Sequence, residues 1–242
     1  MADIVAREVT TNVWTFSKPF LRANFLPFGG RSTAIKLTSG DVWILVSTPL
    51  SPETKSTISS IGPVKYLVAP DLVHNLYLAE YATEYPEAKV YGPPGLPEKL
   101  AKQGSTLKFT GVFEPTSATS PQHGYENDIE ARLFSGHQNK EIAFLHKPSR
   151  TLIEADLVFN LPGKEQYSKS KDKSRVPLIG SLGPHSWLHP WLTRFTSTNK
   201  VETKRDASAV AEWDFDRIIP CHGDVIETDG KNAWKAAFSP FL

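Results

Sequence analysis

Short apolar runs rich in β-branched and aromatic residues alternate along this chain with segments of helical periodicity. Near the start, three such runs at 7–16, 32–38 and 41–48 are separated by segments that contain glycine. Runs of this composition between turns are typical of strands. The sequence therefore predicts three antiparallel strands at the beginning of the chain.

Beyond residue 50 the pattern changes to alternating helices and strands. A helix is expected over 51–62, because Ser51 is a good N-cap residue and Gly62 a stop signal. The two prolines of GPHSWLHPW (183–191) argue against one continuous helix there. This order of elements predicts an α/β fold. The remaining predicted helices lie at 75–86, 94–104 and 205–215, and the remaining predicted strands at 64–70, 88–92, 128–136, 141–146, 151–159 and 216–220.

Composition is that of a soluble globular protein. The chain has 242 residues, 40% of them hydrophobic and 22% charged, with a formal net charge of +1. It is long enough to bury a sizeable core, and its charge gives no general attraction to nucleic acid or anionic membranes. The Lys- and Ser-rich stretch 162–175 also contains acidic residues, so we interpret it as a solvated surface loop. We expect a small-molecule substrate as partner, with no nucleic acid and no membrane.

Targeting and redox features point to a reducing compartment. The opening MADIVAREVTTNVW lacks a basic region followed by an apolar one, so no signal peptide is expected. The apolar runs are far shorter than a membrane span. A single cysteine, Cys221, excludes an intramolecular disulfide and a cysteine-cluster zinc site. We therefore expect a cytoplasmic protein.

Polar side chains recur where predicted strands end. Asp71 and His74 follow the strand at 64–70, and His137, Asp156 and His222 each follow or end a later strand. Imidazole and carboxylate groups are the usual ligands of catalytic zinc or iron, and three of them leave a position open for water. Strand ends that meet in one pocket would make these residues a metal site.

Three stretches resemble the metallo-β-lactamase superfamily. SGHQNKEIAFLHKPSRTLIEADLVFN (135–160) is similar to the segment in which Gly-His precedes two strands and an aspartate. FDRIIPCHGD (215–224) resembles the late Pro-Gly-His-Gly strand end, and VKYLVAPDLVHNLYLAEY (64–81) fits the same order. Within the superfamily the chain is most similar to a sparsely characterised domain family with an aliphatic-Ala-Pro-x-x-x-His motif. The resemblance implies a four-layer αβ/βα sandwich formed by one domain, residues 1–242.

The resemblance also implies a reduced ligand set. When His74 is aligned with the last histidine of the superfamily pattern His-x-His-x-Asp-His, Ala69, Asp71 and Val73 occupy the three other ligand positions. We therefore expect one divalent ion, zinc or else iron, instead of two. The expected metal ligands are His74, His137, Asp156 and His222, and the expected catalytic residues are Asp71 and Asp156.

The implied activity is hydrolysis of a small ester, lactone or related substrate by a metal-activated water. Asp71 would replace the missing acid at Val73 as general base if its loop turns the carboxylate towards the water. Two alternatives remain open. The chain could be a binding protein that kept the sandwich and lost catalysis, or an oxidoreductase with non-haem iron.

Cys221 is interpreted as a packing residue. It stands next to His222 on an extended segment, so alternation along a strand predicts that its thiol points to the opposite face. Free cysteines are among the most buried residues. Replacement by serine is then expected to leave metal binding intact.

Overall fold

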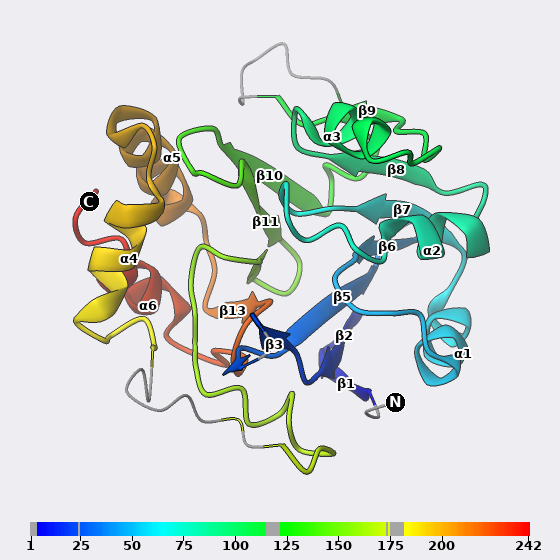
Figure 1. The fold of residues 1–242 in the computed structure, drawn as a ribbon, viewed down its shortest axis with the longest axis horizontal. Coiled ribbons are helices and arrows are strands. Elements are labelled where there is room, and N and C mark those ends of the chain that lie inside the picture. The colour runs from blue at the N-terminus through cyan, green and yellow to red at the C-terminus, as the bar shows by residue number, and fades with distance from the viewer. Residues whose placement is uncertain (1–3, 24, 115–121, 173, 175–181) are drawn as a thin grey trace.

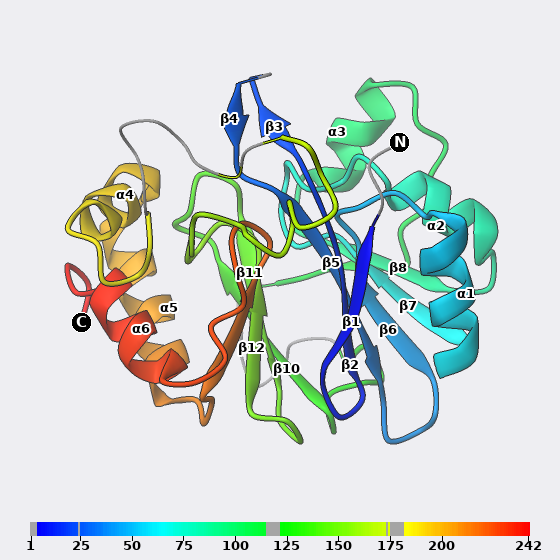
Figure 2. The same ribbon diagram turned by 90° about the horizontal axis from the view of Figure 1, so that it is seen from below.

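The computed structural model describes residues 4–23, 25–114, 122–172, 174 and 182–242. Two β-sheets face each other across the middle of the molecule, and helices cover the outer side of each (Figure 1). Figure 2 shows the order of the layers, which is helix, sheet, sheet, helix. The predicted α/β class and the four-layer sandwich are thus confirmed.

The larger sheet has the strand order β1-β2-β5-β6-β7-β8-β9. Strands β1, β2, β5 and β6 are antiparallel, whereas the pairs from β6 to β9 are parallel. Parallel neighbours need a crossover connection, and here α1, α2 and α3 supply it on the outer face. The elements are β1 (Val5–Thr10), β2 (Val13–Lys18), β5 (Gly30–Lys36), β6 (Val42–Leu45), α1 (Pro52–Ile61), β7 (Val64–Val68), α2 (Leu78–Glu84), β8 (Lys89–Gly92), α3 (Leu96–Lys102) and β9 (Gly111–Val112).

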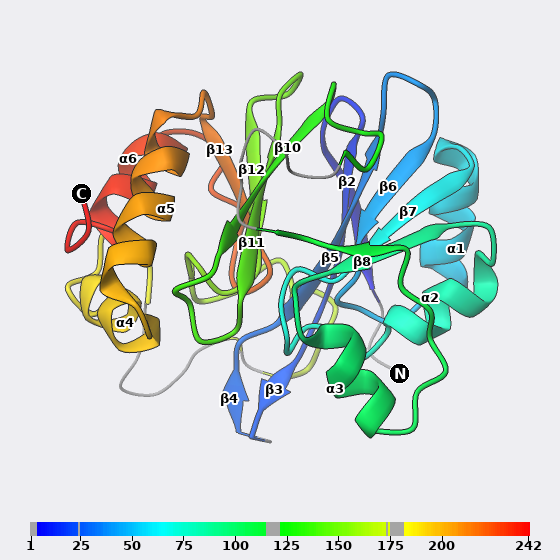
Figure 3. The same ribbon diagram turned by 90° about the horizontal axis from the view of Figure 1, so that it is seen from above.

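The smaller sheet has the order β10-β11-β12-β13, with β13 parallel to β12. Helices α4, α5 and α6 pack outside it (Figure 3). A separate two-stranded ribbon, β3–β4, projects from the rim near the ends of β5 and β2. These elements are β3 (Leu21–Arg22), β4 (Leu26–Pro27), β10 (Ile129–Phe134), β11 (Glu141–His146), β12 (Thr151–Glu154), α4 (Leu188–Thr196), α5 (Lys200–Glu212), β13 (Arg217–Pro220) and α6 (Gly230–Ala237).

The core follows from the alternation of side chains along the strands. One face of each sheet points to the other sheet and the second face points to its helices. Burying one large aliphatic or aromatic side chain contributes about 1.5–3 kcal/mol, so these three layers of contact hold the sandwich together. The cluster between the sheets includes Val13, Ile35, Trp43, Val68, Ile129, Phe144, Ile153 and Ile219.

Most predicted elements are present, with a few corrections. Helix α1 begins after Ser51, whose side chain accepts a hydrogen bond from Thr54 N at 3.1 Å, as predicted. The single strand expected at 7–16 is instead a hairpin, because Asn12 turns the chain with a φ of 66°. Helix α4 forms despite Pro190, which lies in its first turn where a backbone N–H is not needed. Helix α6 was not predicted.

The stretch 162–175 is less exposed than expected. Gln166 and Tyr167 are buried, and Tyr167 donates a hydrogen bond to Phe20 O at 2.8 Å. The loop is therefore packed in part against the segment before β3, whereas Lys164, Ser168, Lys169, Lys171 and Asp172 are exposed, as expected for a surface loop; residues 173 and 175 lie outside the described residues. Among the described residues, none of the helices has the length and apolar character that a bilayer crossing requires.

Candidate metal centre

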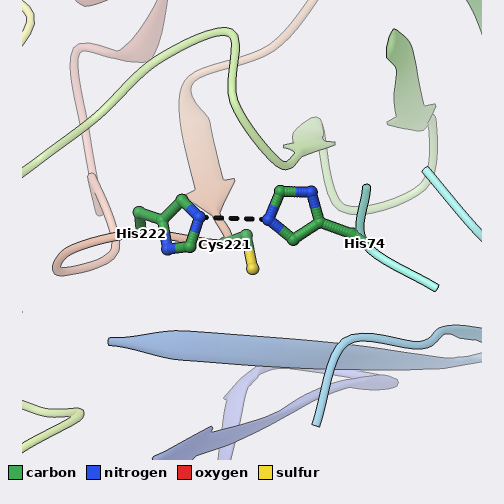
Figure 4. Close-up of side chains that lie close together, drawn as sticks. All are labelled: His74, Cys221 and His222. Carbon is green, nitrogen blue, oxygen red and sulfur yellow. Dashed lines mark hydrogen bonds between the residues drawn. The ribbon is translucent and has the colours of Figure 1, made fainter. Parts of the chain in front are cut away.

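Three strand ends bring the predicted site residues together. Asp71 and His74 lie in the loop after β7, Asp156 in the loop after β12, and His222 in the loop after β13. Strand β7 belongs to the larger sheet and the other two to the smaller one, so the site lies between the sheets at one rim. Figure 4 shows His74 and His222 pointing towards each other from the two sides, with Cys221 beside them.

His74 is held by the carboxylate of Asp71. Oδ1 of Asp71 accepts hydrogen bonds from the backbone N–H groups of Val73 and His74, at 2.7 and 2.6 Å. Oδ2 accepts one from Nδ1 of His74 at 2.7 Å. Nδ1 therefore carries the ring hydrogen, so Nε2 of a neutral His74 has no hydrogen and presents a lone pair. Asp71 is fully buried and lines neither of the cavities next to the site, so this position does not suit a general base.

His222 is fixed in the same tautomer by the backbone. Its Nδ1 donates to Gly29 O at 2.7 Å, because a carbonyl oxygen can only accept. Phe159 stacks on the imidazole with ring centroids 5.5 Å apart and an interplanar angle of 14°. Because Nδ1 carries the ring hydrogen, Nε2 of a neutral His222 presents the second lone pair of the site.

The two Nε2 atoms lie 3.0 Å apart. Two lone pairs at this distance repel each other unless a cation lies between them, and that cation is either a proton or a metal ion. Burial lowers the pKa of His74, but Asp71 and Asp156 together raise it well above the ordinary value. The surroundings therefore favour positive charge between the rings.

Oδ1 of Asp156 completes a triangle of potential metal-binding atoms with Nε2 of His74 and Nε2 of His222, called the donor triangle below. Its Oδ2 accepts a hydrogen bond from Asn139 Nδ2 at 2.9 Å, whereas buried Oδ1 accepts none among the described residues. Oδ1 lies 3.3 Å from Nε2 of His222 and 4.0 Å from Nε2 of His74. Burial raises the pKa of Asp156, but the two histidines more than offset this and hold it below its ordinary value.

This donor set fits a tetrahedral metal ion. Ligands about 2.0–2.2 Å from zinc in tetrahedral geometry lie about 3.4 Å from one another. The three edges of the triangle, 3.0, 3.3 and 4.0 Å, bracket that spacing. Two neutral imidazoles and one carboxylate are also the ligands that catalytic zinc takes, and the hydrogen bonds of Asp71 and Gly29 are the outer contacts such histidines make.

His137, the fourth expected ligand, lies to one side. It is buried, and its Nδ1 accepts a hydrogen bond from Asn139 N at 3.3 Å. It lines an adjoining cavity together with Asp156. It is not a member of the groups of potential ligands found among the described residues, which comprise His74, Cys221 and His222, and Asp71, His74 and Asp156.

Cys221 faces the site, so its predicted orientation is wrong. Its Sγ lies within 4.8 Å of ring nitrogens of both histidines (Figure 4). It also lies 3.1 Å from Ser47 Oγ. Strand β13 ends at Pro220, so the alternation of strand side chains no longer applies one residue later. Burial raises the pKa of this thiol, but His222 and His74 lower it to about 6.

Buried polar residues that the sequence did not reveal support the site. Glu141 accepts hydrogen bonds from the backbone N–H groups of Ala155 and Asp156, at 2.6 and 3.0 Å. Arg31, only 1% exposed, donates to the carbonyl oxygens of Pro220 and Gly223, at 2.6 and 2.7 Å. A charged residue at or directly before the start of a predicted strand is the one signal that could have marked them.

Solved structures with the same fold are metallo-β-lactamases. FIM-1 from Pseudomonas aeruginosa, in its mono-zinc form, has a TM-score of 0.65 at 12% identity, covering 99% of this chain and 95% of that one. The enzyme from Erythrobacter litoralis, with β-mercaptoethanol in its active site, has a TM-score of 0.65 at 11% identity, covering 100% and 97%. The one from Pontibacter korlensis has a TM-score of 0.61 at 12% identity, covering 99% of both chains. At such identities the likeness shows the fold alone.

Sequence comparison assigns the family more directly. No curated protein matches the chain. The model of one family, described as a domain of unknown function (DUF4336), matches residues 11–181, which is more than half of the chain. The protein therefore belongs to the DUF4336 family and has the metallo-β-lactamase fold.

Proposed function

We propose that this protein is a metal-dependent hydrolase of a small ester, lactone or thioester, with one divalent ion, zinc, held by His74, Asp156 and His222. The observation that carries the proposal is the triangle formed by Nε2 of His74, Nε2 of His222 and Oδ1 of Asp156, with its edges of 3.0, 3.3 and 4.0 Å. The metallo-β-lactamase fold supports it, because FIM-1, a solved structure with this fold, is described in a mono-zinc form.

A bound divalent ion lowers the pKa of a water molecule to about 7 and polarises a carbonyl oxygen. The chain's own residues orient the donors. Asp71 and Gly29 hold the two imidazoles, and Asn139 and Glu141 hold Asp156. Asp71 is thus proposed as a positioning residue for His74.

We propose three metal ligands from the protein and leave out Cys221, because its thiol already has a hydrogen-bond partner. Its Sγ is within hydrogen-bond distance of Ser47 Oγ, at 3.1 Å, whereas Oδ1 of Asp156 accepts no hydrogen bond among the described residues. Three ligands leave a coordination position open, as catalysis requires, while four would close the site.

Metal analysis and hydrolysis assays test the proposal together. Purified protein should hold about one divalent ion per chain and hydrolyse at least one member of a panel of esters, thioesters and lactones. His74→Ala, His222→Ala and Asp156→Asn should each lose the ion and the activity. The matched control is His185→Ala, since His185 is exposed and lies away from the site.

Other outcomes would select the alternatives. A zinc-loaded protein inactive on every substrate class would contradict hydrolysis and favour a binding protein with this fold. Iron as the retained ion would favour an oxidoreductase. Two tightly held ions per chain would contradict the reduced ligand set.

A further inference from the structure

An apolar cavity of about 380 Å³ opens beside Asp156. Its volume lies within the range of small-molecule sites. Its wall is formed by the β3–β4 ribbon, the loop after β12 and helix α4. Most of its lining is apolar: Leu26, Phe28, Phe159, Leu182, Leu188, Trp191, Leu192 and Phe195.

Helix α4 gives this cavity an apolar stripe. Leu188, Trp191, Leu192 and Phe195 are spaced three and four residues apart, so they share one face of the helix. Trp191 and Phe195 are stacked, with ring centroids 5.4 Å apart, yet they are 61% and 66% exposed. Large apolar side chains gathered at a cavity mouth are typical of a site for an apolar ligand.

His137 contributes a buried polar group, its imidazole, to the lining of the same cavity. Because Nδ1 accepts the hydrogen bond from Asn139 N, Nε2 of the neutral ring carries the hydrogen. That N–H is buried and has no partner among the described residues, and the side chain is 4% exposed. An unsatisfied buried donor is energetically unfavourable, so an acceptor on a ligand would relieve it.

A second cavity of about 210 Å³ is lined by His74 and His222. Lys18 and Arg22 line it, no acidic residue does, and Arg22 also lines the apolar cavity. Neither basic side chain forms an ion pair within the described part of the chain. The donor triangle thus adjoins an apolar cavity and a second cavity that carries two basic side chains.

We infer that the substrate is an anionic ester or thioester of an apolar carboxylic acid, an inference that rests on the proposed hydrolase function. The acyl chain occupies the α4 cavity, the carbonyl group lies at the donor triangle within reach of His137, and the anionic end of the leaving group lies near Lys18 and Arg22. Hydrolysis adds the oxygen and one hydrogen of water to the acyl carbon. The acyl C–O or C–S bond breaks, and the second hydrogen goes to the alcohol or thiol that leaves.

Binding of slowly reacting amide analogues tests the substrate class without relying on turnover. N-butanoyl-, N-hexanoyl- and N-octanoylglycine, below their micelle-forming concentrations, are titrated into metal-free protein by calorimetry. Affinity should rise about fourfold per methylene until the cavity is full, the factor that corresponds to about 0.8 kcal/mol. The free acids should bind more tightly than their methyl esters.

Substitutions in each cavity test which part of the ligand that cavity binds. Trp191→Ala and Leu192→Trp should each flatten the chain-length series, one by removing a wall and the other by filling the space. Trp187→Ala is the matched control, because Trp187 is 82% exposed and does not line the cavity. Arg22→Gln should reduce the difference between the acid and its methyl ester, and Lys18→Gln combined with Arg22→Gln should abolish it.

The outcomes separate this inference from the hydrolase proposal. A flat series in a protein that hydrolyses short neutral esters would overturn the substrate class and leave the hydrolase function standing. A steep series in the metal-free protein, together with a zinc-loaded protein that hydrolyses nothing, would overturn the hydrolase function, while supporting the cavity as an acyl-binding site. Equal effects of Trp187→Ala and Trp191→Ala would overturn the assignment of the α4 cavity.

Discussion

Asp71 illustrates how one side chain can serve the site without facing it. Its two oxygens hold the backbone and the ring of His74, and so they decide which ring nitrogen is free. The aspartate thus stands where a metal ligand or a base was expected from the sequence, but it acts through its neighbour.

Removal of that carboxylate should weaken metal binding without abolishing it. Outer partners of metal-bound histidines typically account for 10–100-fold in affinity. We expect Asp71→Ala to raise the zinc dissociation constant by about 10–100-fold, measured by competition with a chromophoric chelator. Val73→Ala is the control, because Val73 is next to Asp71 in the loop but 47% exposed. An unchanged constant in Asp71→Ala would show that the contact does not support the ion.

Cys221 decides whether the fourth coordination position is open. With His74, Asp156 and His222 as ligands, cobalt-substituted protein should lack a thiolate-to-cobalt charge-transfer band, and Cys221→Ser should leave the cobalt spectrum unchanged. Serine keeps a hydroxyl beside Ser47, so the substitution is conservative in shape. A charge-transfer band that disappears in Cys221→Ser would make the thiolate a ligand, close the site and contradict the hydrolase proposal.

Among the elements, the loop after β13 depends on a buried arginine from the opposite sheet. Arg31 extends from β5 and joins the carbonyl oxygens at the end of β13 and in that loop to Ser17 and Glu165. The two sheets are therefore linked directly beneath His222.

Loss of Arg31 should be costly, because it leaves buried carbonyl oxygens without a donor. We expect Arg31→Met to lower the free energy of unfolding by about 3–5 kcal/mol, measured by urea denaturation. Arg7→Met is the matched control: Arg7 also pairs with Glu165, at 2.8 Å, but its side chain is 36% exposed. A pair exposed in this way contributes only about 0–1 kcal/mol. Similar losses of unfolding free energy in the two variants would contradict a role of Arg31 in stabilising the loop after β13.

Across the whole molecule, the site joins the two halves of the sandwich. His74 comes from the larger sheet, while Asp156 and His222 come from the smaller one. An ion held by all three would link the sheets, so metal binding and folding should be coupled.

Zinc should therefore raise the melting temperature. At a free concentration 100 times the dissociation constant, a single site adds about 2.7 kcal/mol of stability. For a chain of this size that corresponds to about 5–11 °C. Differential scanning fluorimetry with zinc and with a chelator measures the shift, which should vanish in His74→Ala and Asp156→Asn. A shift that persists in both variants would place the stabilising ion elsewhere.

Local sequence patterns were sufficient to predict most of the helices and strands of this protein. Ser51 and Gly62 bounded a helix correctly, and apolar runs located most strands, because capping and hydrophobic periodicity depend on neighbouring residues. Polar residues at strand ends also marked His74, Asp156 and His222, which the structure brings together. The role of these residues as ligands, and the single domain over 1–242, stay predictions.

The remaining features depend on residues far apart in the sequence. Cys221 faces the histidines because its strand has already ended, and His137 lines the apolar cavity next to Asp156. Arg31 lies 189 residues from the Pro220 carbonyl that it binds. Hydrogen bonds and cavities of this kind form only when the two sheets pack together. The sequence by itself therefore determined the elements and the residues available for chemistry, whereas the tertiary structure alone decided which of them meet.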